Sequence, residues 1–149
     1  MGERQDTVDG LAVRLGHAVI HDIPDAVVYA DRDGVIRFWN PGATRIFGFS
    51  SDEAVGRSLD IIIPERRRRR HWDGYTAMMR SGASRHGSGE LLSVPAMAKT
   101  GETLSIQFTV APVRDRNGAL CGVVAVLRHV TAAFRELKRL RASLVTPAR

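Results

Sequence analysis

The sequence predicts an α+β domain in which antiparallel strands are combined with short helices. Two β-rich runs meet at an Asp-Gly turn, several short helical segments follow, and three further strand-like stretches precede a C-terminal helical segment. The chain has 149 residues, 44% of them hydrophobic, which is enough for one domain with a buried core. Its apolar runs are only a few residues long, far short of the about 20 that cross a bilayer. We therefore expect one cytoplasmic domain without a membrane partner.

The first elements are a helix and a hairpin. Apolar residues recur at steps of three and four between positions 8 and 19, which predicts a short amphipathic helix. Residues 26–30 and 35–39 are β-rich and are separated by Asp33 and Gly34. An Asp-Gly pair between two such runs is a strong signal for a β-hairpin.

The middle of the chain predicts several helices. Asn40 and Pro41 are typical of an N-cap and the first helical position. A second short helix is predicted over 50–56, and residues 59–63 form a small apolar segment. A longer helix is predicted over 66–80.

The long helix has one face that carries chemistry. His71, Tyr75, Met78 and Met79 follow one another at helical spacing and therefore share a side. The arginines at 66–70 oppose the positive end of the helix dipole, so we expect the helix to begin after residue 66 or to fray there.

The last third predicts three strands, over 89–94, 104–110 and 121–127, of which the last is almost entirely apolar, as a central strand would be. Apolar residues between 130 and 144 then alternate in steps of three and four. This pattern indicates a short coiled-coil helix, and we expect a homodimer formed through the two flanking helices.

Charge and residue types exclude several classes of function. The net charge is +6, but the excess is concentrated at 66–70 and near the C-terminal end, which argues against a broad nucleic-acid platform. The single cysteine, Cys121, excludes an internal disulfide and a cysteine metal cage. No Ser-His-Asp or paired-carboxylate arrangement stands at motif spacing, so we do not expect an enzyme.

Six short motifs together resemble the PAS domain family. They are Ile23-Pro24-Asp25-Ala26, Asp33-Gly34, Asn40 with Ala43 and Phe47-Gly48, Asp52-Glu53-Ala54-Val55-Gly56, Lys99-Thr100-Gly101, and Arg128-His129-Val130-Thr131, in which His129 replaces the aspartate usual in the family. The resemblance implies a five-stranded antiparallel sheet with short helices on one face and with flanking N- and C-terminal helices. It also implies three segments: an N-terminal arm and helix at 1–22, a PAS domain at 23–131 and a signalling helix at 132–149.

The stretch from residue 63 to Tyr75 is similar to a segment of the bacterial heme-PAS oxygen sensors. The resemblance implies that His71 is the axial ligand of heme b, in a gas or redox sensor, with Tyr75 and Met78 on the same face. Glu90 stands near the position at which those sensors place a distal arginine. The remaining implied contacts are apolar walls (Leu91, Leu92, Ile106, Phe108, Val124 and Val126) and charge partners for the propionates (Arg80, Arg85 and His86). An Asn-Cys-Arg motif is missing from the sequence, so a flavin is not expected.

Two other interpretations of the same residues remain open. His71 can be a hydrogen-bonded or surface histidine. The domain is then a cofactor-free module for dimerisation or protein interaction, with a cavity filled by Met78, Met79 and Phe108. The pocket can also take a small organic effector. We expect the output to belong to a separate protein, such as a kinase or a regulator, or else the chain to be a fragment of a longer protein.

Overall fold

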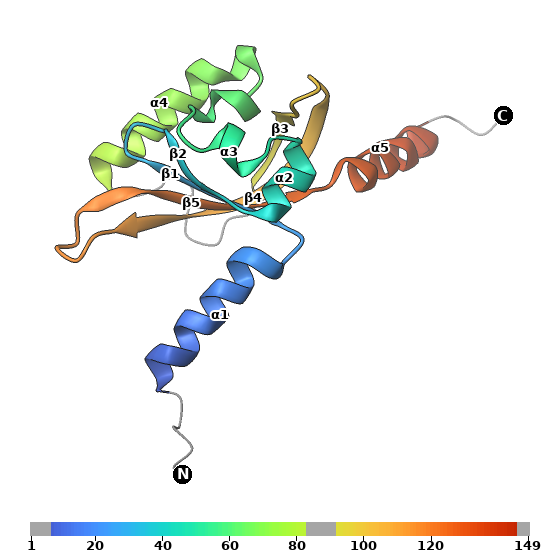
Figure 1. The fold of residues 1–149 in the computed structure, drawn as a ribbon. Coiled ribbons are helices and arrows are strands. Elements are labelled where there is room, and N and C mark those ends of the chain that lie inside the picture. Colours follow the sequence, from blue (N-terminus) through green and yellow to red (C-terminus); the bar gives the residue numbers. More distant parts are fainter. Residues whose placement is uncertain (1–6, 83–91, 146–149) are drawn as a thin grey trace, which may run out of the picture.

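The computed structural model describes residues 7–82 and 92–145, and a single five-stranded sheet dominates them (Figure 1). The strand order is β2-β1-β5-β4-β3, and every neighbouring pair is antiparallel, which confirms the predicted fold class. The strands are β1 (Ala26–Asp31), β2 (Ile36–Trp39), β3 (Leu92–Met97), β4 (Thr103–Arg114) and β5 (Leu120–His129). The helices are α1 (Val8–Asp22), α2 (Pro41–Phe47), α3 (Ser51–Ala54), the 3-10 turn η1 (Leu59–Ile62), α4 (Glu65–Ser81) and α5 (Thr131–Val145).

The core lies between the sheet and the helices α2, α3 and α4, which cover one face of the sheet (Figure 1). We call this the inner face. Cross-strand neighbours share a face of a sheet, so the register of β1, β5 and β4 decides which side chains point inward. The inner face and the helices that cover it bury one apolar cluster, which includes Ala26, Val28, Leu104, Ile106 and Leu127 from the strands and Ala43, Phe47 and Ile62 from the helices.

Asn40 joins three elements at the edge of this core. Its side chain is 1% exposed and makes four hydrogen bonds. Oδ1 accepts from the backbone N–H groups of Val27 (2.8 Å) and Ala43 (2.9 Å), so it caps α2 as the sequence predicts. Nδ2 donates to the carbonyls of Ile20 (2.7 Å) and Asp25 (3.0 Å). The amide therefore ties the end of α1 to the start of β1 and of α2.

The helix α4 begins earlier than expected. It starts at Glu65, so residues 66–70 all lie inside it, and the expectation of a later start is wrong. Pro64 stands at the N-cap and provides no side-chain hydrogen bond. Packing of the apolar side of α4 on the sheet outweighs the unfavourable charge of its first turns.

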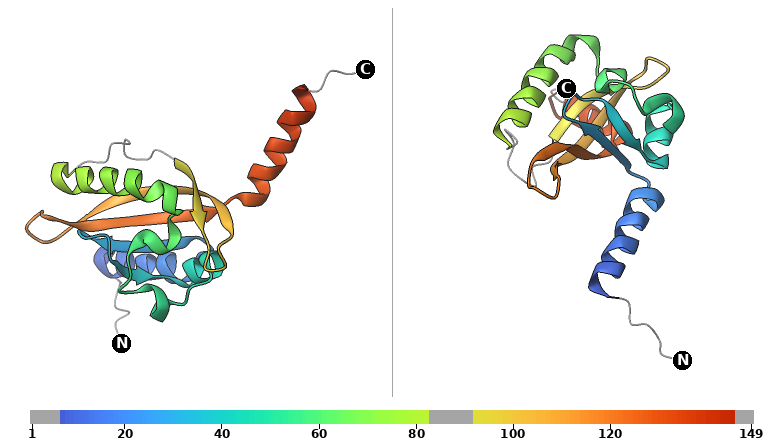
Figure 2. Two further views of the ribbon diagram at one scale, coloured as in Figure 1. Left: turned by 90° about the horizontal axis from the view of Figure 1, so that it is seen from above. Right: turned by 60° about the vertical axis from the view of Figure 1, so that its left-hand side comes forward.

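The flanking helices α1 and α5 project away from the sheet (Figure 2). α1 has no buried residue, and Leu11, Leu15 and Val19 are 45–57% exposed. In α5, Leu137 and Leu140 are 48% and 47% exposed. Within the described parts of the chain, no helix has the length and apolar character needed to cross a membrane.

Candidate functional site

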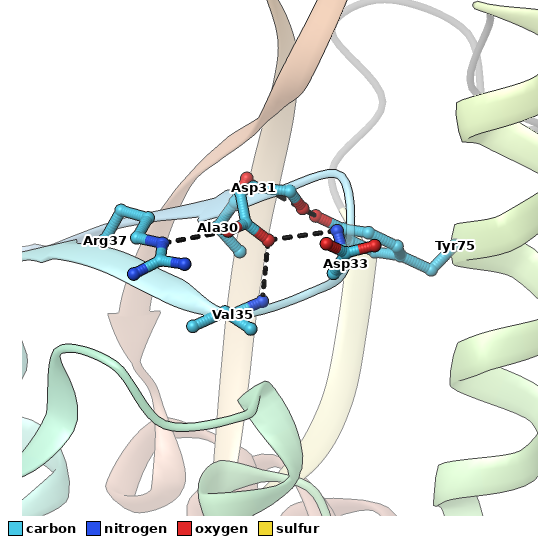
Figure 3. Close-up of polar contacts among 6 residues, drawn as sticks. All are labelled: Ala30, Asp31, Asp33, Val35, Arg37 and Tyr75. Carbon is cyan, nitrogen blue, oxygen red and sulfur yellow. Dashed lines mark hydrogen bonds and ion pairs between the residues drawn. The ribbon is translucent and has the colours of Figure 1, made fainter.

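The candidate site lies where α4 crosses the end of the β1–β2 hairpin. Tyr75 points from α4 to the hairpin, and its hydroxyl donates to the backbone carbonyl of Asp31 at 2.5 Å (Figure 3). Burial raises the pKa of the Tyr75 phenol, so the group stays protonated and can donate at any physiological pH. Tyr75 and Met79 pack against Ala30 and Val123 of the inner face. α4 therefore rests directly on the sheet at this end.

The Asp31 carboxylate holds the hairpin in shape. Oδ1 accepts from the N–H groups of Asp33 (2.9 Å) and Val35 (3.0 Å), and Oδ2 accepts from Arg37 Nε at 2.8 Å (Figure 3). Burial alone would raise the pKa of Asp31, but these three hydrogen bonds outweigh it and lower the pKa. The carboxylate stays ionised and fixes the backbone that receives Tyr75.

His71 lies one turn before Tyr75 on α4. Its ring centroid is 4.7 Å from that of Trp72 and 5.8 Å from that of Tyr75. The Nδ1 atom is buried and has no hydrogen-bond partner. Burial lowers the pKa of the imidazole and outweighs the nearby charge of Asp60, which would raise it. The structure thus presents a neutral imidazole with an unused buried nitrogen.

Two open pockets, each of about 420 Å³, lie on either side of this region. The hairpin pocket, between the hairpin turn and α4, is lined by Arg32, Asp33, Trp72, Tyr75, Thr76, Met79 and Arg80. The helix-start pocket, near the first turns of α4, is lined by Phe49, Arg57, Ser58, Asp60, Ile61, Arg68 and Met97. His71 lines neither of them. Within residues 7–82 and 92–145, no three His, Cys, Asp or Glu side chains are grouped as a metal site would need.

The structure brings together some of the predicted site residues. His71, Tyr75 and Met78 lie on α4, and the last two belong to the cluster that packs on the sheet. Ile106 and Phe108 belong to the inner-face core, and Leu92 pairs with Phe108 and so faces the same way. Arg80 is exposed and lines the hairpin pocket.

The expectation that Val124 and Val126 line a cavity below the helices is wrong. Their register partners on β1 are Tyr29 and Val27, so they lie on the opposite face of the sheet. The inner-face residues of β5 are instead Val123, Ala125 and Leu127. The other predicted residues, Arg85, His86, Glu90 and Leu91, lie outside the described residues.

The connection from β5 to α5 is fixed by the predicted motif at 128–131. Thr131 Oγ1 accepts from Ser105 N at 3.0 Å and lies 2.5 Å from His129 Nε2, so the histidine does contact the first residue of α5. Arg128 donates twice to the Asp25 carboxylate, at 3.1 and 3.2 Å. This ion pair joins the end of β5 to the segment that follows α1.

The sequence alone does not predict the contacts that hold the site. It indicates a turn at Asp31 and a cap at Asn40, but no contact between Tyr75 and the hairpin. A signal for the first was present, because Asp two residues before Asp33 is a common start of a side-chain-capped turn. The partner of Tyr75 lies 44 residues away in sequence, and no local pattern indicates such a contact.

Comparisons with known proteins agree with this architecture. A family model described as PAS fold matches residues 20–135. The chain is 28% identical over 150 residues to the sensor protein FixL of Bradyrhizobium diazoefficiens, covering 99% of this chain and 30% of that protein. It is 20% identical over 146 residues to the signal transduction histidine-protein kinase AtoS of Escherichia coli, covering 94% of this chain and 23% of that one. The chain thus spans less than a third of the length of these relatives.

Solved structures show the same fold. The PAS domain of a protein from Colwellia psychrerythraea superposes with a TM-score of 0.70 at 18% identity, over 82% of this chain and 98% of that one. An RNA-binding light-oxygen-voltage receptor superposes with a TM-score of 0.69 at 18% identity, over 95% of this chain and 40% of that one. The fold and the sequence together define the class: the chain belongs to the PAS fold family.

Proposed function

We propose that this chain is a sensory, signal-transducing PAS module that binds heme b through His71 and has no catalytic activity of its own. The observation that carries the proposal is the buried Nδ1 atom of His71, which has no partner, together with the lowered pKa of the ring. Neutral imidazole is a standard axial donor to heme iron. The similarity to the sensor protein FixL over nearly the whole chain supports the sensory part of the proposal.

The donor chemistry of the chain fits such a group. His71 would supply the axial nitrogen, and the partly buried Phe108 would supply an apolar inner-face contact. When bound, the heme would supply reversible gas binding or one-electron redox chemistry. The protein's own part is to hold the imidazole neutral and away from water.

A ligand bound between α4 and the sheet would change how α4 packs. Tyr75 and Met79 occupy the contact between α4 and β1, and the Tyr75 hydroxyl holds Asp31. A ligand that enters at His71 therefore competes with this packing and favours an arrangement in which α4 lifts from the hairpin. A ligand that binds the lifted arrangement of α4 more tightly than the packed one increases the population of the lifted arrangement. This change in population is the signal.

Titration of the purified chain with hemin tests the proposal. We expect a Soret band in the wild-type chain that is lost in His71→Ala and retained in His21→Ala, a matched exposed histidine. The proposal fails if the wild-type chain develops no such band, or if the band persists unchanged in His71→Ala.

A cofactor-free dimerisation module is the second candidate. Exposed apolar side chains on both flanking helices favour it, because such stripes are normally covered by a partner. Replacing Leu137, Leu140 and Leu144 by Gln in the full chain should convert a dimer to a monomer in sedimentation analysis. A chain that stays dimeric after this change places the interface elsewhere.

The output is the last part of the proposal. The curated relatives are much longer than this chain, and two of them are a sensor protein and a histidine-protein kinase. We propose that α5 passes the signal to a kinase or regulator, whether separate or linked.

A further inference from the structure

The first turns of α4 carry four exposed arginines that have no acidic partner among residues 7–82 and 92–145. They are Arg66, Arg67, Arg69 and Arg70, and none of them forms an ion pair or side-chain hydrogen bond with the described part of the chain. Arg68 differs from them. It is half-buried and donates to the backbone carbonyls of Ile63 (3.1 Å) and Asp60 (3.3 Å).

This arrangement opposes the stability of the helix. The N-terminal end of a helix is positive, and cations there are unfavourable. Arg66 also stands three and four residues before Arg69 and Arg70, where like charges repel on a helix surface. The N-cap Pro64 gives no compensating side-chain bond. Folding therefore does not explain why these four arginines are present.

The positive charge is also confined to a short length of α4. The run at 66–70 holds five of the 22 Lys and Arg residues of the chain. At 1.5 Å per residue, it spans about 6 Å along the helix axis. Asp60, Glu65 and Asp73 flank it closely in sequence, so the positive patch is short and suits a short anionic segment better than a long phosphate backbone. The nearby Trp72 cannot stack on a base freely, because its indole N–H is held by Asp60 Oδ1 at 2.7 Å.

The helix-start pocket lies at the same end of α4, and Arg68, in the middle of the run, forms part of its wall. Phe49, Ile61 and Met97 give it apolar walls. The Arg57 guanidinium lies 5.9 Å from the centre of the Phe49 ring, at the same opening. A pocket of about 420 Å³ is large enough for one bulky apolar side chain.

We propose that the first turns of α4 and the helix-start pocket together form a docking surface for an acidic segment of a partner protein. The carboxylates of that segment pair with the four exposed arginines, for which Arg offers two-pronged hydrogen bonds. One large apolar side chain of the segment enters the pocket as an anchor. This surface does not use His71, so its test is independent of the test for heme binding.

Fluorescence anisotropy with the full chain tests the surface. The probe is a labelled peptide of six glutamates around a central leucine, and a 20-base-pair DNA duplex serves as the alternative polyanion. The charge-removal variant replaces the four arginines by Gln, and the matched control replaces four basic residues of α5 by Gln: Arg135, Lys138, Arg139 and Arg141.

We expect the α4 variant to bind the peptide at least tenfold more weakly, while the α5 control binds it within twofold of the wild-type chain. A peptide with alanine in place of leucine should bind the wild-type chain several-fold more weakly. The proposal is overturned if both variants lose affinity equally, if the two peptides bind alike, or if the duplex binds more tightly than the peptide.

Thermal unfolding gives a second readout that a folding role would move in the opposite direction. We expect the α4 variant to unfold at the same or a higher temperature than the wild-type chain, because unfavourable charges are removed from the helix start. A lower midpoint would assign the arginines to folding and would contradict the proposal.

Discussion

Replacing Asn40 by Ala should destabilise the fold strongly, because its buried side chain joins α1, β1 and α2. The side chain satisfies two buried N–H donors, of Val27 and Ala43, and donates to the carbonyls of Ile20 and Asp25. Loss of an N-cap side chain costs about 1 kcal/mol. A buried N–H left without a partner costs about 1–3 kcal/mol more. We therefore expect the free energy of unfolding to fall by about 2–4 kcal/mol.

Urea unfolding followed by circular dichroism measures this change. Asn40→Asp is the informative control, because a carboxylate still accepts from Val27 and Ala43 but cannot donate to Ile20 and Asp25. It should retain the α2 cap and release the end of α1, which faster amide exchange in α1 would show. A loss below about 1 kcal/mol in Asn40→Ala would mean that water replaces the amide, and the reasoning from buried donors would be refuted.

Two further predictions concern the hairpin turn and a surface ion pair. Gly34→Ala should lower the free energy of unfolding by about 2–4 kcal/mol, because φ is +76° and the new Cβ would lie 2.1 Å from the Trp72 ring. Gly56→Ala is the control, since its φ is +93° but the space around it is open. In the same urea assay it should lower the free energy of unfolding by only about 1–2 kcal/mol. The hydrogen bond from Lys99 lowers the pKa of Glu53 from 4.5 to about 2, so its stabilising effect is present above pH about 4.5 and is lost as the pH falls toward about 2. Glu53→Gln should therefore show a shallower loss of stability over that pH range, and equal slopes for the two chains would contradict this.

Local signals were sufficient for most of the fold. Asp33 and Gly34 predicted the hairpin, and Asn40 with Pro41 predicted the start of α2, because turns and caps depend on residues that are adjacent in sequence. The apolar run at 121–127 predicted the central strand, and β5 does lie third of the five strands in the sheet. The fold class therefore followed from patterns of a few residues each.

The sequence does not predict which residues of β5 face the core. Residues 123–127 are apolar without interruption, so a period of two has no contrast to reveal. Only the pairing with β1 shows that Val123 points inward and Val124 outward. The start of α4 failed for a related reason, since tertiary packing outweighed the charge pattern that the sequence displays. The hydrogen bond from Tyr75 to Asp31 likewise depends on long-range placement.

The pairing of Ala26 with Leu127 has a consequence for how such a module sits in a longer polypeptide. The chain comes in from α1 at the start of β1 and leaves to α5 at the end of β5, and these two strand ends are adjacent. The Asp25–Arg128 ion pair bridges the two connections directly. A twist or a tilt of α1 therefore acts next to the start of α5, and the reverse also holds. The segments before and after the domain share one pivot, so a movement does not have to pass across the whole width of the sheet.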